Sequence, residues 1–381
     1  MSFTVMIADL APWLILCVGG GDTASVSERH PTPLRQSILV ASADQTDHRY
    51  LAFPAILDLG DDVLVSFKRG RSHAQDTGAT LDLLRLDPRT GRVTEHRTLA
   101  ALDGHILQMG EWVRFPNGDI ANYIDTQVAG KATTRVGLHA VRSTDGGRTF
   151  GPLQKVGAID GVEYGYAFDA ITEGPTTWLL AMTFANLPGG KSVYPPRPHA
   201  GAVHVLRSDD NGRTWKFVRD LSHEFGDVPI NESTFLRHGD GFLVSTRGYD
   251  DRQRLHLTDG DFHMIRQADL TGSHEFITSH LGRPRLFVRD GNAYLLGRNW
   301  TKSPRAMQLA LFRIDPATLT AATHVVLDNA ERANIADGYY AMPFFRGEGI
   351  ETRMYVVDYK RPAGQAGADI VLHEFRWADV K

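Results

Sequence analysis

The sequence predicts an all-β protein, a six-bladed β-propeller with four-stranded antiparallel blades. Three observations lead to this prediction. A pair of apolar runs joined by a short turn recurs six times, and an aspartate-containing turn recurs roughly every 50 to 65 residues. No long stretch has helical periodicity. A two-sheet sandwich is the rival architecture, but it does not explain six units of similar length.

Composition agrees with a turn-rich β protein and narrows the function classes. The chain has 381 residues, 42% of them hydrophobic, with 37 glycines and 18 prolines. Its net charge is −4 and it has no basic block, so we expect no nucleic-acid partner. The single cysteine, Cys17, excludes an internal disulfide framework and any multi-cysteine metal site. The sequence has no metal-binding motif and no dinucleotide-binding glycine pattern, so we expect no cofactor.

The N-terminus is interpreted as a leader or linker over residues 1–35, followed by one propeller domain over residues 36–381. Leu10–Val18 is an apolar run too short to span a bilayer, so no membrane span is expected. It is similar to the apolar part of a signal peptide, although no Lys or Arg precedes it. We expect a secreted or periplasmic monomer, with a cytoplasmic location left open.

The predicted hairpins define the blades in chain order. In each, an apolar run leads through a short turn, usually with Gly beside Asp or Asn, into a second apolar run. The first strand of each blade should line the central channel, so polar residues next to the hairpins are site candidates. A short helix is expected around Leu327–Asn334. The six hairpins are Ala55–Phe67, Glu111–Ile124, Ala167–Thr183, Ser233–Arg247, Arg283–Arg298 and Ala341–Tyr359.

Two turns, Ser143–Phe150 and Ser208–Trp215, share the pattern S-x-D-x-G-x-T-W/F. Their Asp and Ser side chains can accept backbone N–H groups, the Gly permits a positive φ, and the final aromatic residue can pack into a core. Degenerate versions occur at Asp87, Asp259 and Asp315. We expect these turns between strands late in each blade, where they hold the blade together.

These turns on six repeats resemble the Asp-boxes of the sialidase superfamily, also called BNR-repeat proteins, over nearly all of the chain after His48. Asn231–Thr234, in a hairpin that ends at Arg247, looks like the segment that supplies a catalytic glutamate and a carboxylate-binding arginine. Asp337–Ala341 is similar to the segment that supplies a tyrosine nucleophile. Tyr340 fits better than Tyr339, and two adjacent tyrosines should point to opposite faces.

The resemblance has one departure. Tyr50–Ile56 looks like the family's F/Y-R-I-P-A-L opening, but Ala52 stands where the arginine is expected. Asp76 falls in the loop where the family places its acid/base aspartate. The third carboxylate-binding arginine is expected at Arg298, with Arg283 as the alternative. The nearby cations that could compensate for Ala52 are Lys68, Arg69 and Arg71.

The resemblance implies an exo-α-sialidase-like glycoside hydrolase that acts on a glycan ending in sialic acid or a related nonulosonic acid. Arginines can bind the sugar carboxylate through two parallel N–H groups. A neutral tyrosine avoids the repulsion that a carboxylate nucleophile would meet. Glu232 would take the proton of Tyr340, and Asp76 would protonate the leaving oxygen and then activate water.

Two other readings stay open. One is a propeller enzyme for another polysaccharide, either a different exo-glycosidase or a uronate lyase. A lyase would use a histidine and a tyrosine, for which His73, His105 and the segment Tyr164–Tyr166 are candidates. The other is a non-catalytic propeller that binds glycans. The identity of the sugar also stays open, because Ala52 removes one expected contact to its carboxylate.

Overall fold

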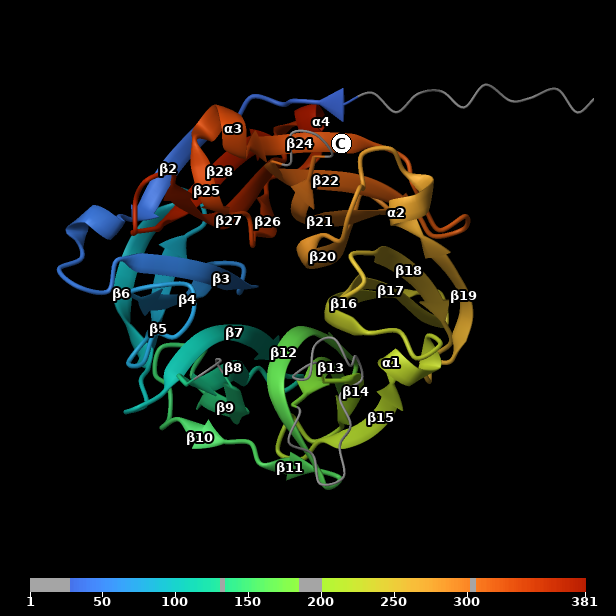
Figure 1. Ribbon diagram of the computed structural model, residues 1–381, viewed down its shortest axis with the longest axis horizontal. Helices are drawn as coiled ribbons and strands as arrows, with labels where there is room; N and C mark the ends of the chain where they lie inside the picture. The colour runs from blue at the N-terminus through green and yellow to red at the C-terminus, as the bar shows by residue number, and fades with distance from the viewer. Residues whose placement is uncertain (1–27, 131–133, 185–200, 302–305) are drawn as a thin grey trace, which may run out of the picture.

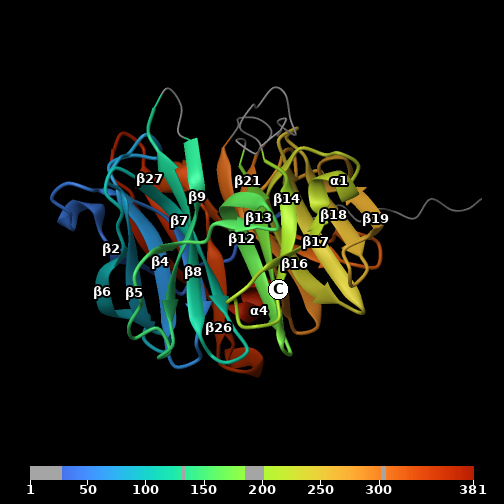
Figure 2. The same ribbon diagram turned by 90° about the horizontal axis from the view of Figure 1, so that it is seen from below.

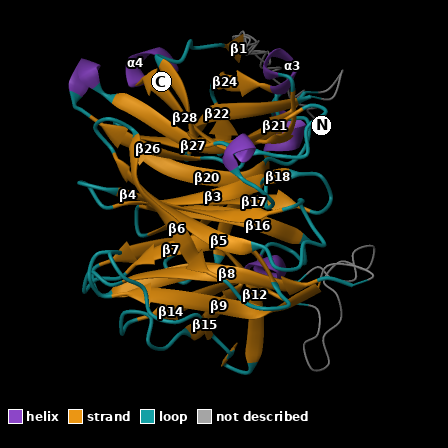
Figure 3. Cartoon of the chain, turned by 90° about the vertical axis from the view of Figure 1, so that its left-hand side faces the viewer, coloured by secondary structure: helices purple, strands orange, loops and turns teal. Residues whose placement is uncertain are grey.

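The computed structural model describes residues 28–130, 134–184, 201–301 and 306–381. In this part of the chain six antiparallel sheets are arranged in a ring (Figure 1), which confirms the predicted six-bladed propeller. The strands run across the thickness of the ring (Figure 2), and strands joined by loops make up most of the body (Figure 3). The apolar run Leu10–Val18 and Cys17 lie outside the described residues.

Blades 1 to 4 are each built from consecutive strands, which follow the predicted hairpins. The order in each sheet is the chain order, so every connection between neighbours is a simple turn or loop. Blade 1 contains β3 (Tyr50–Asp58), β4 (Val63–Gly70), β5 (Thr80–Asp87) and β6 (Arg92–Ala100). Blade 2 contains β7 (Ile106–Arg114), β8 (Ile120–Val128), β9 (Thr134–Ser143) and β10 (Gln154–Lys155). Blade 3 contains β12 (Val162–Glu173), β13 (Thr176–Thr183), β14 (Val203–Ser208) and β15 (Lys216–Asp220), with β11 (Ala158–Ile159) beside β12. Blade 4 contains β16 (Ile230–His238), β17 (Gly241–Gly248), β18 (Gln253–Thr258) and β19 (Met264–Asp269).

Blades 5 and 6 include strands from both ends of the described chain. Blade 5 contains β20 (Gly282–Arg289), β21 (Asn292–Trp300), β22 (Met307–Asp315) and β24 (His324–Asn329), with β23 (Thr320–Ala321) on β22 and β1 (Glu28–Arg29) parallel to β24. Blade 6 contains β25 (Ile335–Gly338), β26 (Met342–Arg346), β27 (Arg353–Pro362), β28 (Asp369–Arg376) and β2 (Arg35–Val40). Because β2 pairs with β28, an early strand completes the last blade and closes the ring.

Burial explains why inner and outer strands differ in sequence. β3 and β7 are buried along nearly their whole length, because they pack between neighbouring blades, and they are accordingly almost continuously apolar. In the outer strand β6 exposed and half-buried residues alternate, as expected for a sheet with one wet face. Neighbouring blades contact each other through their inner strands. A charged residue inside an inner strand is therefore unusual and marks a candidate site.

The helices are short, and each follows the last strand of a blade in chain order. They are α1 (Leu221–Glu224), α2 (Leu270–Ser273), α3 (Ala330–Ala333) and α4 (Trp377–Val380), besides two 3₁₀ turns at Ser42–Asp44 and Gly349–Glu351. The first three begin after Asp220, Asp269 and Asn329, whose side chains accept backbone N–H groups of the first turn. The helix expected around Leu327–Asn334 is confirmed as α3. In the described ranges no helix is long and apolar enough to cross a membrane.

The two aspartate turns lie between the third and fourth strands of blades 2 and 3, as predicted. Asp145 accepts the Thr149 hydroxyl at 2.6 Å, and Asp210 accepts the Thr214 hydroxyl at the same distance. Hydrogen bonds from Thr214 lower the pKa of Asp210 to about 2. Trp215 stacks edge-on against Tyr123 of β8 and donates its indole N–H to the Tyr123 hydroxyl at 2.9 Å. The turn of blade 3 therefore also fixes the contact with blade 2.

Candidate active site

Two adjacent tyrosines lie between β25 and β26 and point to different sides, as the sequence predicted. Tyr339 has a φ of +69°, which turns the backbone sharply between the two side chains. Its hydroxyl donates to Asp328 at 3.0 Å, within the core between blades 5 and 6. Tyr340 packs instead against Phe53, and its hydroxyl accepts a hydrogen bond from Nη1 of Arg247 at 2.9 Å.

Blade 4 supplies a buried carboxylate and a guanidinium next to Tyr340. Glu232, on β16, forms an ion pair with Arg247, at the end of β17. It also accepts the backbone N–H of Arg283 at 2.9 Å and the hydroxyl of Tyr166 at 3.0 Å. Burial favours a higher pKa for Glu232, but the charges of Arg247 and Arg283 outweigh burial and lower its pKa to about 2. Glu232 is therefore ionised at neutral pH, and Nη1 of Arg247 bridges it to the Tyr340 hydroxyl.

Arg298, on β21, brings a second guanidinium to Tyr340 from blade 5. Its charged carbon lies 4.4 Å from the centre of the Tyr340 ring, and Nη1 lies 3.3 Å from a carboxylate oxygen of Asp337. The opposing strand carries Gly282, which makes this packing possible. A Cβ at that position would lie 2.8 Å from the Tyr340 ring and 2.9 Å from Nε of Arg298. Guanidinium groups from two blades thus flank one phenol.

Arg283 is close to these groups but is occupied by the protein. It sits at an irregularity of β20 with a φ of +46°, and its side chain is 3% exposed. Its guanidinium binds the Tyr166 hydroxyl at 2.7 Å and the Glu111 carboxylate at 2.5 Å. Glu111 also forms an ion pair with the buried Arg285. Arg283 therefore holds Glu232 in place, directly through its backbone N–H and indirectly through the Tyr166 hydroxyl.

Among the described residues, the cation opposite Ala52 is engaged by other groups of the protein. Ala52 is fully buried and lies opposite Lys68 in the pairing of β3 with β4. The Lys68 amine contacts the Asp76 carboxylate at 3.3 Å and the Ser72 carbonyl oxygen at 2.9 Å. Burial lowers the pKa of Lys68 to about 8, against the opposing effect of Asp76. Lys68 is thus committed to the loop between β4 and β5.

Three of the predicted site residues lie apart from Tyr340. The Asp76 side chain is 1% exposed and accepts the backbone N–H of Arg71 at 2.8 Å, so it points beneath its own loop. Arg69 forms an ion pair with Asp82 at 2.9 Å on the outer side of blade 1. Arg71 is half exposed and pairs with Asp47 at 2.6 Å. The other five predicted residues, Tyr340, Glu232, Arg247, Arg298 and Arg283, are linked by the contacts described above.

Asp337 organises a second group of polar side chains beside Tyr340. It accepts the hydroxyls of Tyr50 at 2.5 Å and Tyr359 at 2.9 Å, and it lies 3.3 Å from Nδ1 of His73. Burial favours a higher pKa for Asp337, but hydrogen bonds from His73 and Tyr50 and the charge of Arg298 hold the pKa well below its usual range. Asp337 is an ionised acceptor for donors from three blades.

Sequence reasoning missed Glu111 and Arg285 and gave Asp337 no role. A signal for Glu111 existed: it is an acidic residue in the middle of Ile106–Arg114, an inner strand that is buried up to its last residue. Arg285 is likewise a buried charged residue inside β20. No metal role follows for the acidic residues, since the described ranges hold no cluster of three or more His, Cys, Asp or Glu side chains that could bind a metal ion.

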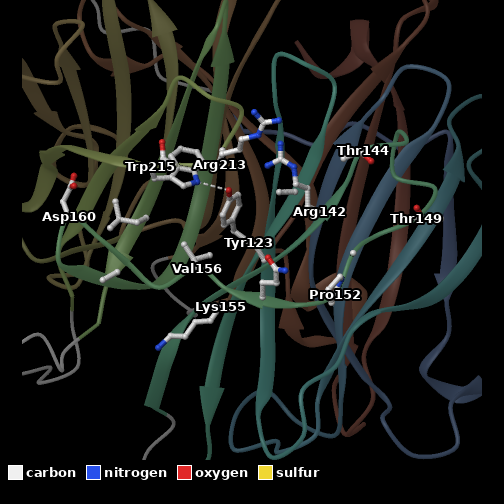
Figure 4. Close-up of a pocket in the computed structure, with 18 residues that line it drawn as sticks. Tyr123, Arg142, Thr144, Thr149, Pro152, Lys155, Val156, Asp160, Arg213 and Trp215 are labelled. Atoms are coloured by element: carbon white, nitrogen blue, oxygen red, sulfur yellow. Dashed lines mark hydrogen bonds between the residues drawn. The ribbon is translucent and has the colours of Figure 1, made fainter.

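A cavity of about 880 Å³ lies elsewhere, between blades 2 and 3 (Figure 4). Both aspartate turns contribute to its wall, together with Tyr123, Arg142 and Trp215. The side chains that line the cavity have structural roles in the packing of the blades: Trp215 donates to Tyr123, and Arg142 pairs with Asp119 at 2.6 Å. None of the predicted site residues lines this cavity. The chemistry is therefore better sought at Tyr340, where charged groups converge.

Comparison with known proteins gives the fold. No protein-family model matches the chain, and no curated protein matches its sequence. A Dyadobacter fermentans protein of unknown function superposes with a TM-score of 0.66 at 15% identity, over 92% of this chain and 99% of that chain. A mutant of the NanB sialidase from Streptococcus pneumoniae superposes with a TM-score of 0.62 at 10% identity, over 91% of this chain and 71% of that chain. The Trypanosoma rangeli sialidase in complex with sialic acid superposes with a TM-score of 0.57 at 10% identity, over 92% of this chain and 60% of that chain. The chain thus has a sialidase-like propeller fold.

Proposed function

We propose that this protein is a sialidase-like exo-glycosidase that removes a terminal acidic sugar, a sialic acid or related nonulosonic acid, with retention of configuration. One observation carries the proposal: Tyr340, Glu232, Arg247 and Arg298 converge from blades 4, 5 and 6. A phenol next to two guanidinium groups and a buried carboxylate suits an anionic substrate. The sialidase-like fold supports the same choice, and the T. rangeli neighbour binds sialic acid.

In the proposed reaction Tyr340 is the nucleophile. Its oxygen attacks the anomeric carbon, and Glu232 receives the phenolic proton. Arg247 and Arg298 lie where negative charge on the phenolic oxygen and on the sugar carboxylate would be stabilised. A carboxylate nucleophile would be repelled by the acidic sugar, whereas a neutral phenol is not. Retention follows because two displacements occur at the same carbon.

Substrate binding in this site would rely on two arginines. Ala52 contributes no charge, Lys68 is bound to Asp76, and Arg283 is bound to Glu111. A lost charge-assisted hydrogen bond costs about 1.5–3 kcal/mol. We therefore propose that the enzyme has a high KM for simple sialosides, or that it prefers a nonulosonic acid whose other substituents add contacts.

The test is hydrolysis of 4-methylumbelliferyl sialoside, monitored by the fluorescence of the released product. The released sugar is identified by mass spectrometry. Tyr340→Phe and Glu232→Gln should each abolish measurable turnover. Tyr339→Phe is the matched control, because it removes the neighbouring hydroxyl, which binds Asp328 in the core. Equal activity in Tyr340→Phe and Tyr339→Phe would overturn the assignment of the nucleophile. Binding without turnover across a glycan panel would instead favour a glycan-binding propeller.

A second candidate, a uronate lyase, is favoured by one contact. His73 lies 3.0 Å from the Tyr50 hydroxyl, which gives a histidine beside a tyrosine, and Asp337 connects this pair to Arg298. Of the other candidates, Tyr164 binds His204 and His105 binds the carbonyl oxygen of Asp103, whereas Tyr166 donates to Glu232. Release of an unsaturated uronate from a polyuronate, seen by ultraviolet absorbance, would select this activity over glycoside hydrolysis.

A further inference from the structure

The loop between β4 and β5 presents one titratable side chain on its exposed side and buries another. His73 is 56% exposed, whereas Asp76 is 1% exposed. The Asp76 carboxylate accepts the backbone N–H groups of Arg71 and Ser72 at 2.8 and 3.3 Å. It fits there because residue 70 is glycine, and a Cβ at Gly70 would collide with the carboxylate. Asp76 therefore shapes the loop from within.

Lys68 and Gln108 hold the backbone of His73 in place. The Lys68 amine donates to the carbonyl oxygens of Ser72 and His73 at 2.9 and 3.3 Å. The Gln108 side chain donates to the same His73 carbonyl at 2.8 Å and accepts from Lys68 at 3.0 Å. Buried, fully satisfied networks of this kind fix a side chain's position. Lys68, which lies opposite Ala52, and Gln108 of β7 thus serve to position His73.

Hydrogen bonding also fixes which ring nitrogen of His73 carries a proton. Nδ1 lies 3.3 Å from Asp337 and 3.0 Å from the Tyr50 oxygen. The single Tyr50 hydroxyl proton is donated to Asp337 at 2.5 Å, so the Tyr50 oxygen acts as an acceptor toward His73. Nδ1 must therefore carry a proton in both charge states. Among the residues that the structure describes none hydrogen-bonds Nε2, which leaves it available to a ligand.

His73 and Tyr340 flank the same aromatic ring. The centre of the Phe53 ring lies 5.0 Å from the His73 ring and 5.7 Å from the Tyr340 ring. Phe53 has a φ of +58° at the irregularity of β3, and its ring contacts both of them. Asp337 contacts His73 and also Arg298, which packs against Tyr340. The exposed imidazole of His73 thus contacts the same aromatic ring as Tyr340, which places a proton-transfer group beside the proposed site.

We propose that His73, oriented by Asp337 and Tyr50, is the acid/base residue of this enzyme, and that Asp76 is a structural residue of the loop. The inference rests on the proposed glycosidase function. It changes the substrate-contacting group from a carboxyl to an imidazole, which can both donate and accept a proton. Asp337 holds the ring in its orientation, as a carboxylate does for a catalytic histidine in other enzymes.

The proton balance of the two steps is complete. In the first step the imidazolium gives its Nε2 proton to the glycosidic oxygen as the bond from that oxygen to the anomeric carbon breaks. The bond from the Tyr340 oxygen to that carbon forms, and the phenolic proton passes to Glu232. In the second step neutral Nε2 takes a proton from water, the water oxygen bonds to the anomeric carbon, and the Tyr340 bond breaks as Glu232 returns its proton.

The kinetic test compares two substrates, sialyllactose, which needs protonation of its leaving group, and 4-methylumbelliferyl sialoside, which needs it much less. His73→Asn keeps an N–H donor for Asp337 but cannot titrate. We expect kcat/KM to fall 10²- to 10⁴-fold on sialyllactose and less than about 10-fold on the activated substrate. His263→Asn is the matched control, because His263 is 54% exposed and its Nδ1 also binds an aspartate, Asp259, at 3.0 Å. Asp76→Asn should lower the unfolding temperature, but it should not lower kcat/KM more on sialyllactose than on the activated substrate.

The outcomes separate the inference from the proposed function. Wild-type turnover of neither substrate contradicts the proposed function and the inference with it. If the wild type turns over the substrates, two results overturn the inference alone. One is that Asp76→Asn loses much more kcat/KM on sialyllactose than on the activated substrate. The other is that His73→Asn and His263→Asn have equal activity. If Asp76→Asn does not fold, the His73 ring supplies a second test, by ¹⁵N NMR of the folded wild-type protein. A proton on Nδ1 in the neutral ring supports the proposal, and a neutral ring protonated on Nε2 overturns it.

Discussion

Arg247 touches both of the groups on which the proposed chemistry depends. One of its nitrogens, Nη1, contacts Glu232 and the Tyr340 hydroxyl together. Its charge keeps Glu232 ionised despite burial, and the same charge can stabilise a phenolic anion. A buried carboxylate of this kind is costly without its partner, because removing one member of a buried pair leaves the other uncompensated. The site is therefore also an element of stability.

The depressed pKa of Glu232 makes that stability depend on pH. Its pKa is lowered from 4.5 to about 2, so its contribution is complete above about pH 4.5 and is lost as the pH falls toward 2. Between pH 6 and pH 3 this single group should account for about 2 kcal/mol of the loss in unfolding free energy. Glu232→Gln should remove that part, measured by urea unfolding at both pH values. Parallel losses in the two proteins would contradict the assignment.

Single residues also show how far sequence reasoning reached. Tyr340 was preferred to Tyr339 because it precedes the small residue that opens the strand, and the structure gives the two hydroxyls different partners. The burial of Asp76 was not predictable, because it depends on Lys68 reaching beneath the loop from β4. Glu111 and Arg283 lie 172 positions apart in the chain, and only the closed ring brings them together. Local patterns carry no information about such a pair.

At the level of elements, the inner strands carry irregularities where they reach the site. β3, β16 and β20 each shift register near Phe53, Glu232 and Arg283. Phe53 and Arg283 have positive φ values at two of these shifts, and Tyr339 has one between β25 and β26; such values are uncommon for residues with a Cβ. Such strain persists only where the surrounding structure enforces it, and it is typical of functional sites. The hairpins were predictable from turn residues, whereas these irregularities were not.

Gly282 offers a test of this packing at the start of β20. Gly282→Ala would place a Cβ 2.8 Å from the Tyr340 ring and 2.9 Å from Arg298, so one of them must move. We expect at least a 10-fold loss of kcat/KM in 4-methylumbelliferyl sialoside hydrolysis, with the fold retained by circular dichroism. Gly272→Ala in α2 is the control, since its Cβ would meet no atom closer than 3.7 Å. Equal activity in the two variants would refute the proposed geometry.

At the scale of the whole molecule, the ring is closed by β2, which completes blade 6 through β28. The sequence predicted six repeats, but it did not indicate which end of the chain would complete the last blade. Residues 28–35 were interpreted as part of a linker, yet Glu28–Arg29 pair with β24 and Arg35 begins β2. Ring closure matters for function because Tyr340 and Asp337 belong to this composite blade.

Removing β2 should therefore affect both stability and activity. A chain that begins at Ala41 leaves the β28 edge unpaired, and exposed edges weaken a sheet and favour aggregation. Compared with a chain that begins at Glu28, we expect a lower unfolding temperature by at least 5 °C and a loss of sialoside hydrolysis. Differential scanning calorimetry checks the first expectation. An unchanged transition would show that β2 does not stabilise blade 6.

The central claim, that Tyr340 is the nucleophile of a retaining glycosidase, is tested most directly by trapping the intermediate. 2,3-Difluorosialic acid should react with the wild-type protein, and tandem mass spectrometry of proteolytic peptides should place the added sugar on Tyr340. Tyr340→Phe should carry no adduct, whereas Tyr339→Phe should be labelled like the wild type. Labelling of another residue, or no labelling of a protein that hydrolyses sialosides, would contradict the claim.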